Sequence, residues 1–105
     1  MDKVNILVVD DNENNRYTLC RRLKRLGYED VTEAEHGQEA LEIMQKDQQD
    51  VILLDVMMPI MDGFEVLAHI KNDPKLANTP VIMISALDDL DNVVKSIEMG
   101  ADDYL

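Results

Sequence analysis

The chain contains 105 residues, which is enough for one compact domain and too few for two. Lys and Arg number 10 against 22 Asp and Glu, so the formal net charge is −12 at pH 7. Such a field repels nucleic acid and anionic membranes, and we expect neither as a direct partner. No apolar run approaches the roughly 20 residues of a membrane span. The single cysteine excludes an internal disulfide, and a cytoplasmic protein is the expectation.

Short apolar runs alternate with longer amphipathic segments along the whole chain. Strands are predicted at residues 4–9, 30–34, 51–54 and 81–84, and a fifth begins at 103–105. Helices are predicted at about residues 14–26, 38–46, 63–72 and 88–99. This alternation predicts an α/β fold, a doubly wound parallel sheet with helices on both faces and right-handed crossovers.

The first predicted helix combines an apolar stripe with a group of basic residues. The stripe consists of Leu19, Cys20, Leu23 and Leu26, and Gly27 is a natural residue to end the helix. The basic residues predict a solvated face with cations near the C-terminal end. The alternative is a docking surface for an acidic partner. The basic residues are Arg16, Arg21, Arg22, Lys24 and Arg25.

Polar side chains follow three of the predicted strands at the point where each strand ends. Asp10 and Asp11 follow the first strand, Asp55 follows the third, and Ser85 follows the fourth. In doubly wound sheets, sites form at the carboxyl ends of the strands near the switch point. We therefore expect these side chains to converge, and carboxylates so close together need a compensating charge.

A divalent cation is the compensating charge that fits this pattern best. A calcium loop starting at Asp10 would need Gly at its sixth position and Glu at its twelfth, where the sequence has Asn15 and Arg21. A flavodoxin-type nucleotide site would need a glycine- and hydroxyl-rich loop after the first strand. Mg²⁺, which prefers hard oxygen ligands and commonly links carboxylates to phosphate, is predicted instead.

With such a metal in place, Asp55 can act as a nucleophile. A carboxylate can attack a phosphoryl group to form an aspartyl phosphate, while the metal neutralises charge on the transferring oxygens. Ser85 can donate a hydrogen bond to that phosphoryl group. The sequence therefore predicts a phosphoryl-accepting site.

At these residues the chain resembles the receiver domain of two-component response regulators, of the chemotaxis-regulator type. The resemblance spans the whole length and is most specific where an Asp ends an apolar strand and Met58-Pro59 and Met61-Asp62-Gly63 follow. It implies a flavodoxin-like strand order, 2-1-3-4-5. The matching pieces are ILVVDDNENNR (6–16), HGQEAL (36–41), ILLDVMMPIMDGFEVL (52–67), PVIMISA (80–86) and GADDYL (100–105).

The resemblance also implies a role for each site residue. Asp55 would accept a phosphoryl group from a phosphohistidine of a sensor histidine kinase or phosphotransfer protein. Asp11 would bind Mg²⁺ directly, Asp10 mainly through water, and the Met57 backbone carbonyl would be a further ligand. Ser85 and Tyr104 would be the switch hydroxyl and the switch aromatic. The fourth helix, fifth strand and fifth helix would act on an output domain or a downstream protein.

Two other functions compete with this interpretation. A phosphatase that uses an aspartyl phosphate would carry a second Asp two residues after the nucleophile, where this chain has Met57, so we do not expect an enzyme acting on external substrates. A non-phosphorylated pseudo-receiver, used only as a protein-interaction module, would have lost one of the acids. Asp10, Asp11 and Asp55 are all present.

In the family, a lysine that contacts the phosphoryl group follows two residues after the position of Leu105, and a proline and a fifth helix come next. Residues 1–105 are therefore predicted to be a receiver domain that lacks the C-terminal end of strand five and helix five. We expect such a polypeptide in isolation to melt early and to self-associate, because an open sheet edge and an apolar face invite pairing with another chain.

Overall fold

The structure is a computed structural model that describes residues 4–84 and 99–104. Within these residues, every predicted strand and helix is present. The bounds of each element differ from the predicted bounds by at most two residues. The predicted helix at 88–99 lies outside the described residues, except for Met99 in a turn. The elements are β1 (Ile6–Val9), α1 (Glu13–Arg25), β2 (Val31–Ala34), α2 (Gly37–Lys46), β3 (Val51–Asp55), α3 (Gly63–Asn72), β4 (Val81–Ile84) and β5 (Asp103–Tyr104).

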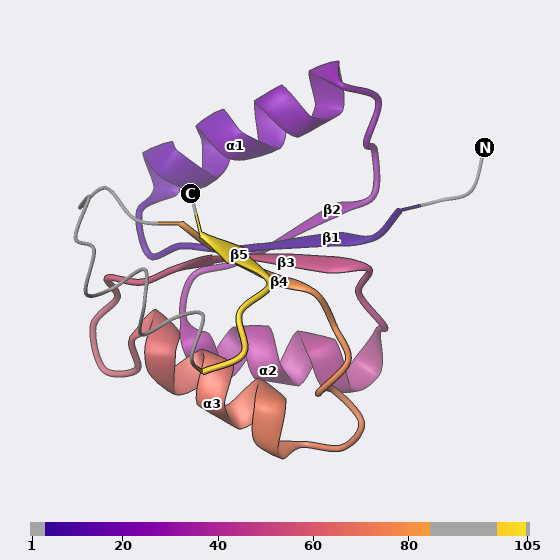
Figure 1. The fold of residues 1–105 in the computed structure, drawn as a ribbon. Helices are drawn as coiled ribbons and strands as arrows, with labels where there is room; N and C mark the ends of the chain where they lie inside the picture. Colours follow the sequence, from indigo (N-terminus) through magenta and orange to yellow (C-terminus); the bar gives the residue numbers. More distant parts are fainter. Residues whose placement is uncertain (1–3, 85–98, 105) are drawn as a thin grey trace.

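The five strands form one parallel sheet in the order β2-β1-β3-β4-β5, which confirms the predicted fold class and strand order. α1 covers one face of the sheet, and α2 and α3 lie together on the other (Figure 1). None of the helices in the described part of the chain is long and apolar enough to cross a membrane. This order places β1 and β3 side by side. β2 is added on one side of β1 and β3 on the other, so the direction in which successive strands are added reverses between β1 and β3.

The core has two parts because side chains alternate between the two faces of each strand. Leu7 and Val9 of β1 pack toward the α2–α3 side, in a cluster that includes Phe64 and Ile70 of α3. Ile6 and Val8 pack toward α1 with the buried Cys20. All four residues of β1 are buried, as expected for a central strand of a parallel sheet.

α1 ends as its sequence predicts, but its apolar stripe is shorter than expected. Gly27 adopts a φ of 100°, and the N–H groups of Gly27 and Tyr28 donate to the carbonyls of Lys24 and Leu23, which forms a Schellman motif. Leu26 is the C-cap residue and its side chain is 74% exposed, so its assignment to the buried stripe was wrong. Because α1 ends at Arg25, the helical periodicity that would turn Leu26 toward the sheet does not reach this residue.

Candidate metal and phosphoryl site

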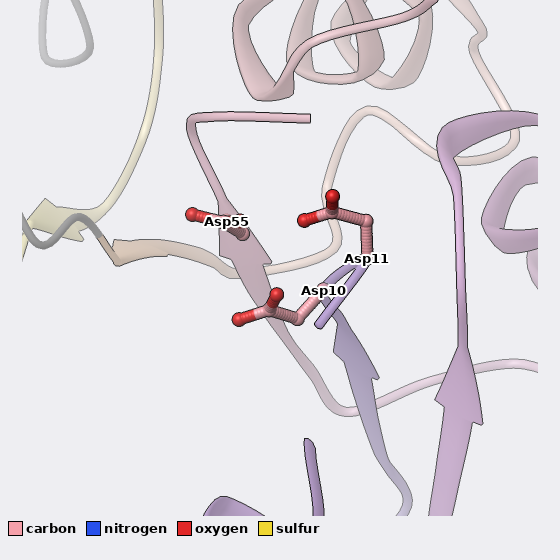
Figure 2. Close-up of side chains that lie close together, drawn as sticks. All are labelled: Asp10, Asp11 and Asp55. Carbon is pink, nitrogen blue, oxygen red and sulfur yellow. The ribbon is translucent and has the colours of Figure 1, made fainter. Parts of the chain in front are cut away.

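Three carboxylates from two neighbouring strand ends meet at the carboxyl edge of the sheet. Val9 of β1 is paired with Leu54 of β3, so Asp10 leaves β1 level with Asp55 at the end of β3. One oxygen from each of Asp10, Asp11 and Asp55 lies within 4.8 Å of the others. Figure 2 shows the three side chains gathered at the ends of the two strands. Asp10 is buried, Asp55 is half-buried and Asp11 is exposed, so the cluster is open to solvent on one side.

The backbone around Asp10 is held at three points. The Asp10 N–H donates to the Ala34 carbonyl of β2 over 3.2 Å, and Asp10 Oδ1 accepts a hydrogen bond from the Asn12 N–H over 2.9 Å. Asn12 is the N-cap of α1, and its own side chain accepts from the Asn15 N–H. The turn from strand to helix therefore fixes the direction in which Asp10 and Asp11 point.

Arg16 makes the third contact that holds the backbone around Asp10. The prediction that Arg16 lies on a solvated face was therefore wrong. The residue is only 6% exposed, and its Nη1 donates to the main-chain carbonyl of Asp10 over 2.7 Å. Nε lies 3.3 Å from Glu33 and Nη2 lies 3.5 Å from Glu35. Arg21, Arg22, Lys24 and Arg25 are exposed as expected.

The loop between β3 and α3 depends on close backbone packing at Gly63. The Gly63 N–H donates to the Val56 carbonyl over 2.9 Å. A Cβ at position 63 would overlap the Asp55 carbonyl oxygen and would lie 2.8 Å from Val56 Cα. Only glycine permits this approach, which brings the start of α3 against the end of β3. Asp62 then caps the helix by accepting from the Glu65 N–H.

The tip of the same loop is strained and exposed. Ile60 has a φ of 70°, which is rare for a β-branched residue, and its side chain is 100% exposed. The Met61 N–H donates to the Pro59 carbonyl over 2.7 Å, so Ile60 is the central residue of a γ-turn. Backbone strain of this kind is found preferentially beside functional sites.

The environment of Asp55 raises its pKa to about 6 from the ordinary value of 3.8. Burial is the largest cause, because it disfavours the charged form, and the neighbouring charge of Asp10 is the second. A hydrogen bond from the Met57 N–H to Asp55 Oδ1, over 3.3 Å, opposes the shift. Asp11 and a hydrogen bond with the Asp10 side chain raise it further. Without a cation, the carboxyl therefore holds its proton in weakly acidic solution.

The donor set fits Mg²⁺. All three donors are hard carboxylate oxygens, and one face of the cluster is open for water ligands. Mg²⁺ binds oxygen at about 2.0–2.1 Å, which places opposite ligands roughly 4.2 Å apart. Oxygens that lie within 4.8 Å of one another are therefore close enough to share one such ion, directly or through its water ligands.

The structure thus brings together Asp10, Asp11 and Asp55 as the sequence predicts. The Met57 side chain is 59% exposed and its N–H faces Asp55, while a ligand role for its carbonyl stays a prediction. Ser85 lies outside the described residues, and Tyr104 is described only as part of the β5 backbone. Sequence reasoning missed Arg16. Its position at the end of the first turn of a helix, where the helix dipole disfavours a cation, was the available signal of a specific partner.

Fold and site together define an α/β domain that has a cluster of three carboxylates, able to hold a metal ion, at the switch point of a parallel sheet. The model of the response regulator receiver domain family matches residues 6–105. The chain therefore belongs to the response regulator receiver domain family.

Named relatives and solved structures agree with this assignment. The response regulator PleD of Caulobacter vibrioides is 46% identical over 100 residues, which cover 95% of this chain and 22% of that protein. The probable transcriptional regulator ycf27 of Cyanophora paradoxa is 42% identical over 105 residues, which cover 100% of this chain and 42% of the relative. The chain thus spans about two fifths of the length of the ycf27 proteins. A crystal structure of the Vibrio cholerae chemotaxis protein CheY4 superposes with a TM-score of 0.91 at 33% identity, covering 99% of this chain and 86% of that one.

Proposed function

We propose that this receiver domain accepts a phosphoryl group on Asp55, with Mg²⁺ held by Asp10, Asp11, Asp55 and the Met57 carbonyl. The observation that carries the proposal is the convergence of the three carboxylates within 4.8 Å. Charges of one sign this close are costly unless a cation joins them, and a carboxylate beside a bound cation can take up phosphate. The bound metal would supply neutralisation of the charge on the transferring oxygens.

The chemical step needs only groups that this site and its donor provide. An Asp55 oxygen attacks the phosphorus of a phosphohistidine, a new P–O bond forms and the P–N bond breaks. The electron pair of the broken bond returns to the imidazole, which takes up a proton. The Met57 N–H bond to Asp55 Oδ1 orients the carboxylate, and the Gly63 contact fixes the end of β3. Met57 stands where a phosphatase of similar chemistry would need a second acid, so the proposed activity is limited to the chain's own Asp55.

The proposed donor is a sensor histidine kinase or a phosphotransfer protein, and the proposed location is the cytoplasm. Ser85 would donate a hydrogen bond to the phosphoryl group, and Tyr104 would change rotamer with it. The named relatives are much longer than this chain, which supports an output domain or a downstream protein as the target of the switch. It stays a prediction that a whole receiver also requires further residues of strand five and a fifth helix. The pseudo-receiver alternative is disfavoured because none of the three acids is replaced.

Incubation with acetyl phosphate and Mg²⁺ tests the proposal. We expect the addition of one phosphoryl group, located at Asp55 by peptide mass spectrometry after borohydride reduction. Asp55→Asn serves as the matched control, since it keeps the size of the side chain and removes the nucleophile. Label on Asp10, Asp11 or a histidine, or equal labelling of the Asp55→Asn variant, would contradict the assignment.

A further inference from the structure

We propose that Arg16 is a positioning residue for the metal-binding carboxylates, acting through the main chain of Asp10. The inference rests on the proposed function, because it concerns the same Mg²⁺ site. Arg16 is not expected to touch the metal or the phosphoryl group. It determines where the carboxylates of the β1–α1 turn are held.

The guanidinium of Arg16 joins three segments of the chain. Nη1 donates to the carbonyl of Asp10 at the end of β1, over 2.7 Å, and this bond is buried. Nε bonds to Glu33 of β2, over 3.3 Å, and Nη2 to Glu35 in the turn that follows β2, over 3.5 Å. The planar fork of an arginine can serve three acceptors in fixed directions, which a lysine cannot do.

Hydrogen bonds hold both of the peptide units that flank the Asp10 Cα. Its N–H is already bound to the Ala34 carbonyl of β2, over 3.2 Å, and its C=O is bound to Arg16. The carbonyl of Asp10 belongs to the peptide that leads into Asp11. A rotation of that peptide would therefore redirect both carboxylates, and the Arg16 bond opposes the rotation.

The outer half of the Arg16 guanidinium, which consists of Nε and Nη2, is held by Glu33 and Glu35. The side chains of Glu33 and Glu35 are 50% and 70% exposed, so their ion pairs with Arg16 are partly screened by solvent. The Glu35 N–H donates to Glu39 of α2 over 2.7 Å, and Glu39 also lies in the first turn of that helix, where His36 is the N-cap. A continuous set of bonds thus connects the N-terminus of α2 to the backbone of Asp10.

Charge alone would give Arg16 the opposite effect on metal binding. A cation next to a metal site repels Mg²⁺, so its removal would tighten binding if charge were its only influence. A positioning role predicts weaker binding after the same change, because misplaced carboxylates no longer converge. Groups that orient metal ligands typically change metal affinity by about 10- to 100-fold when they are replaced. The direction of the change therefore separates the two roles.

The test is a Mg²⁺ titration that is monitored by amide NMR spectra. The spectra report both the dissociation constant for Mg²⁺ and the chemical shifts of the Asp10 and Asp11 amides. Arg16→Lys and Arg16→Gln are compared with the parent, and Arg21→Gln is the matched control, because Arg21 is an exposed cation on the same helix. We expect both Arg16 variants to bind Mg²⁺ about tenfold more weakly, and Arg21→Gln to stay within about twofold of the parent. Unchanged or tighter binding by folded Arg16→Lys and Arg16→Gln would overturn the inference.

A second variant covers the case in which the Arg16 changes prevent folding. Glu33→Ala combined with Glu35→Ala keeps Arg16 and releases its outer half. We expect shifted Asp10 and Asp11 amide signals, and these signals are the readout of the positioning role, because the loss of two carboxylates would by itself weaken Mg²⁺ binding through charge. Unchanged Asp10 and Asp11 amide signals would contradict the inference. Absence of Mg²⁺ binding by the parent would instead contradict the proposed function and, with it, the role of Arg16.

Discussion

The two loops that build the site are stabilised in different ways. The β1–α1 turn, which carries Asp10 and Asp11, is fixed by hydrogen bonds: a capping side chain, a neighbouring strand and a buried arginine. The β3–α3 loop, which carries Asp55 at its start, is fixed by the close backbone approach of Gly63 and ends in the exposed, strained Ile60. The first loop suits the holding of a metal. The second combines a rigid base beside Asp55, the proposed nucleophile, with an exposed tip.

The largest effect that this comparison predicts is for Gly63→Ala. The new Cβ would overlap backbone atoms of Asp55 and Val56, which cannot move aside as a side chain can. We expect a loss of about 3 kcal/mol in the free energy of unfolding. Urea denaturation measures it. Gly27→Ala is the control, because nothing lies within 4 Å of its Cβ position and only its φ of 100° is unfavourable. That variant should lose about 1 kcal/mol, and equal losses for the two variants would show that backbone packing at Gly63 is not the cause.

A smaller effect concerns the pH dependence of stability without metal. The pKa of Asp55 is raised to about 6 in the folded protein from 3.8, so the folded state binds more protons than the unfolded state between these values. The contribution of Asp55 is therefore unfavourable above about pH 6 and disappears as the pH falls toward about 4. Because the carboxylate is partly exposed, we expect on the order of 1–2 kcal/mol.

Thermal melts of the parent and of Asp55→Asn across this pH range isolate that contribution. The difference in stability between the two proteins should favour the variant near neutral pH and shrink on acidification. Mg²⁺ should bind more weakly below about pH 6, since it competes with the proton for Asp55. A stability difference that does not change with pH would contradict the raised pKa.

The smallest predicted effect is at the tip of the β3–α3 loop. Ile60→Asn places a residue that tolerates positive φ at the γ-turn, and no buried apolar surface is lost because Ile60 is fully exposed. We expect a gain of about 1 kcal/mol in stability. Ile60→Val keeps the β-branched side chain and should leave stability unchanged to within about 0.5 kcal/mol. Chemical denaturation of both variants tests the strain, and a destabilised Ile60→Asn would show that the tip is not strained.

Much of the fold and the acidic centre could be predicted because they follow from local sequence patterns. Asp10 and Asp55 each end an apolar run, and the rules of parallel sheets bring such strand ends together. Arg16 could not be placed by the same reasoning, because helical periodicity groups it with its basic neighbours, and its acceptors lie on another strand and the following turn. The closeness of Gly63 to Asp55 also depends on how α3 packs, which periodicity does not encode.

The most direct test of the central claim, that the two loops form one Mg²⁺ site, is a comparison of thermal melts with and without Mg²⁺ for the parent and for Asp11→Ala. Asp11 is exposed, so its loss removes a ligand with little disturbance of the core. With Mg²⁺ at ten times its dissociation constant, the parent should gain about 1.4 kcal/mol, and the Asp11→Ala variant should gain almost nothing. Without Mg²⁺ the variant should be as stable as the parent or more so, because one of three mutually repelling charges is gone. An equal gain from Mg²⁺ in the two proteins would contradict the account.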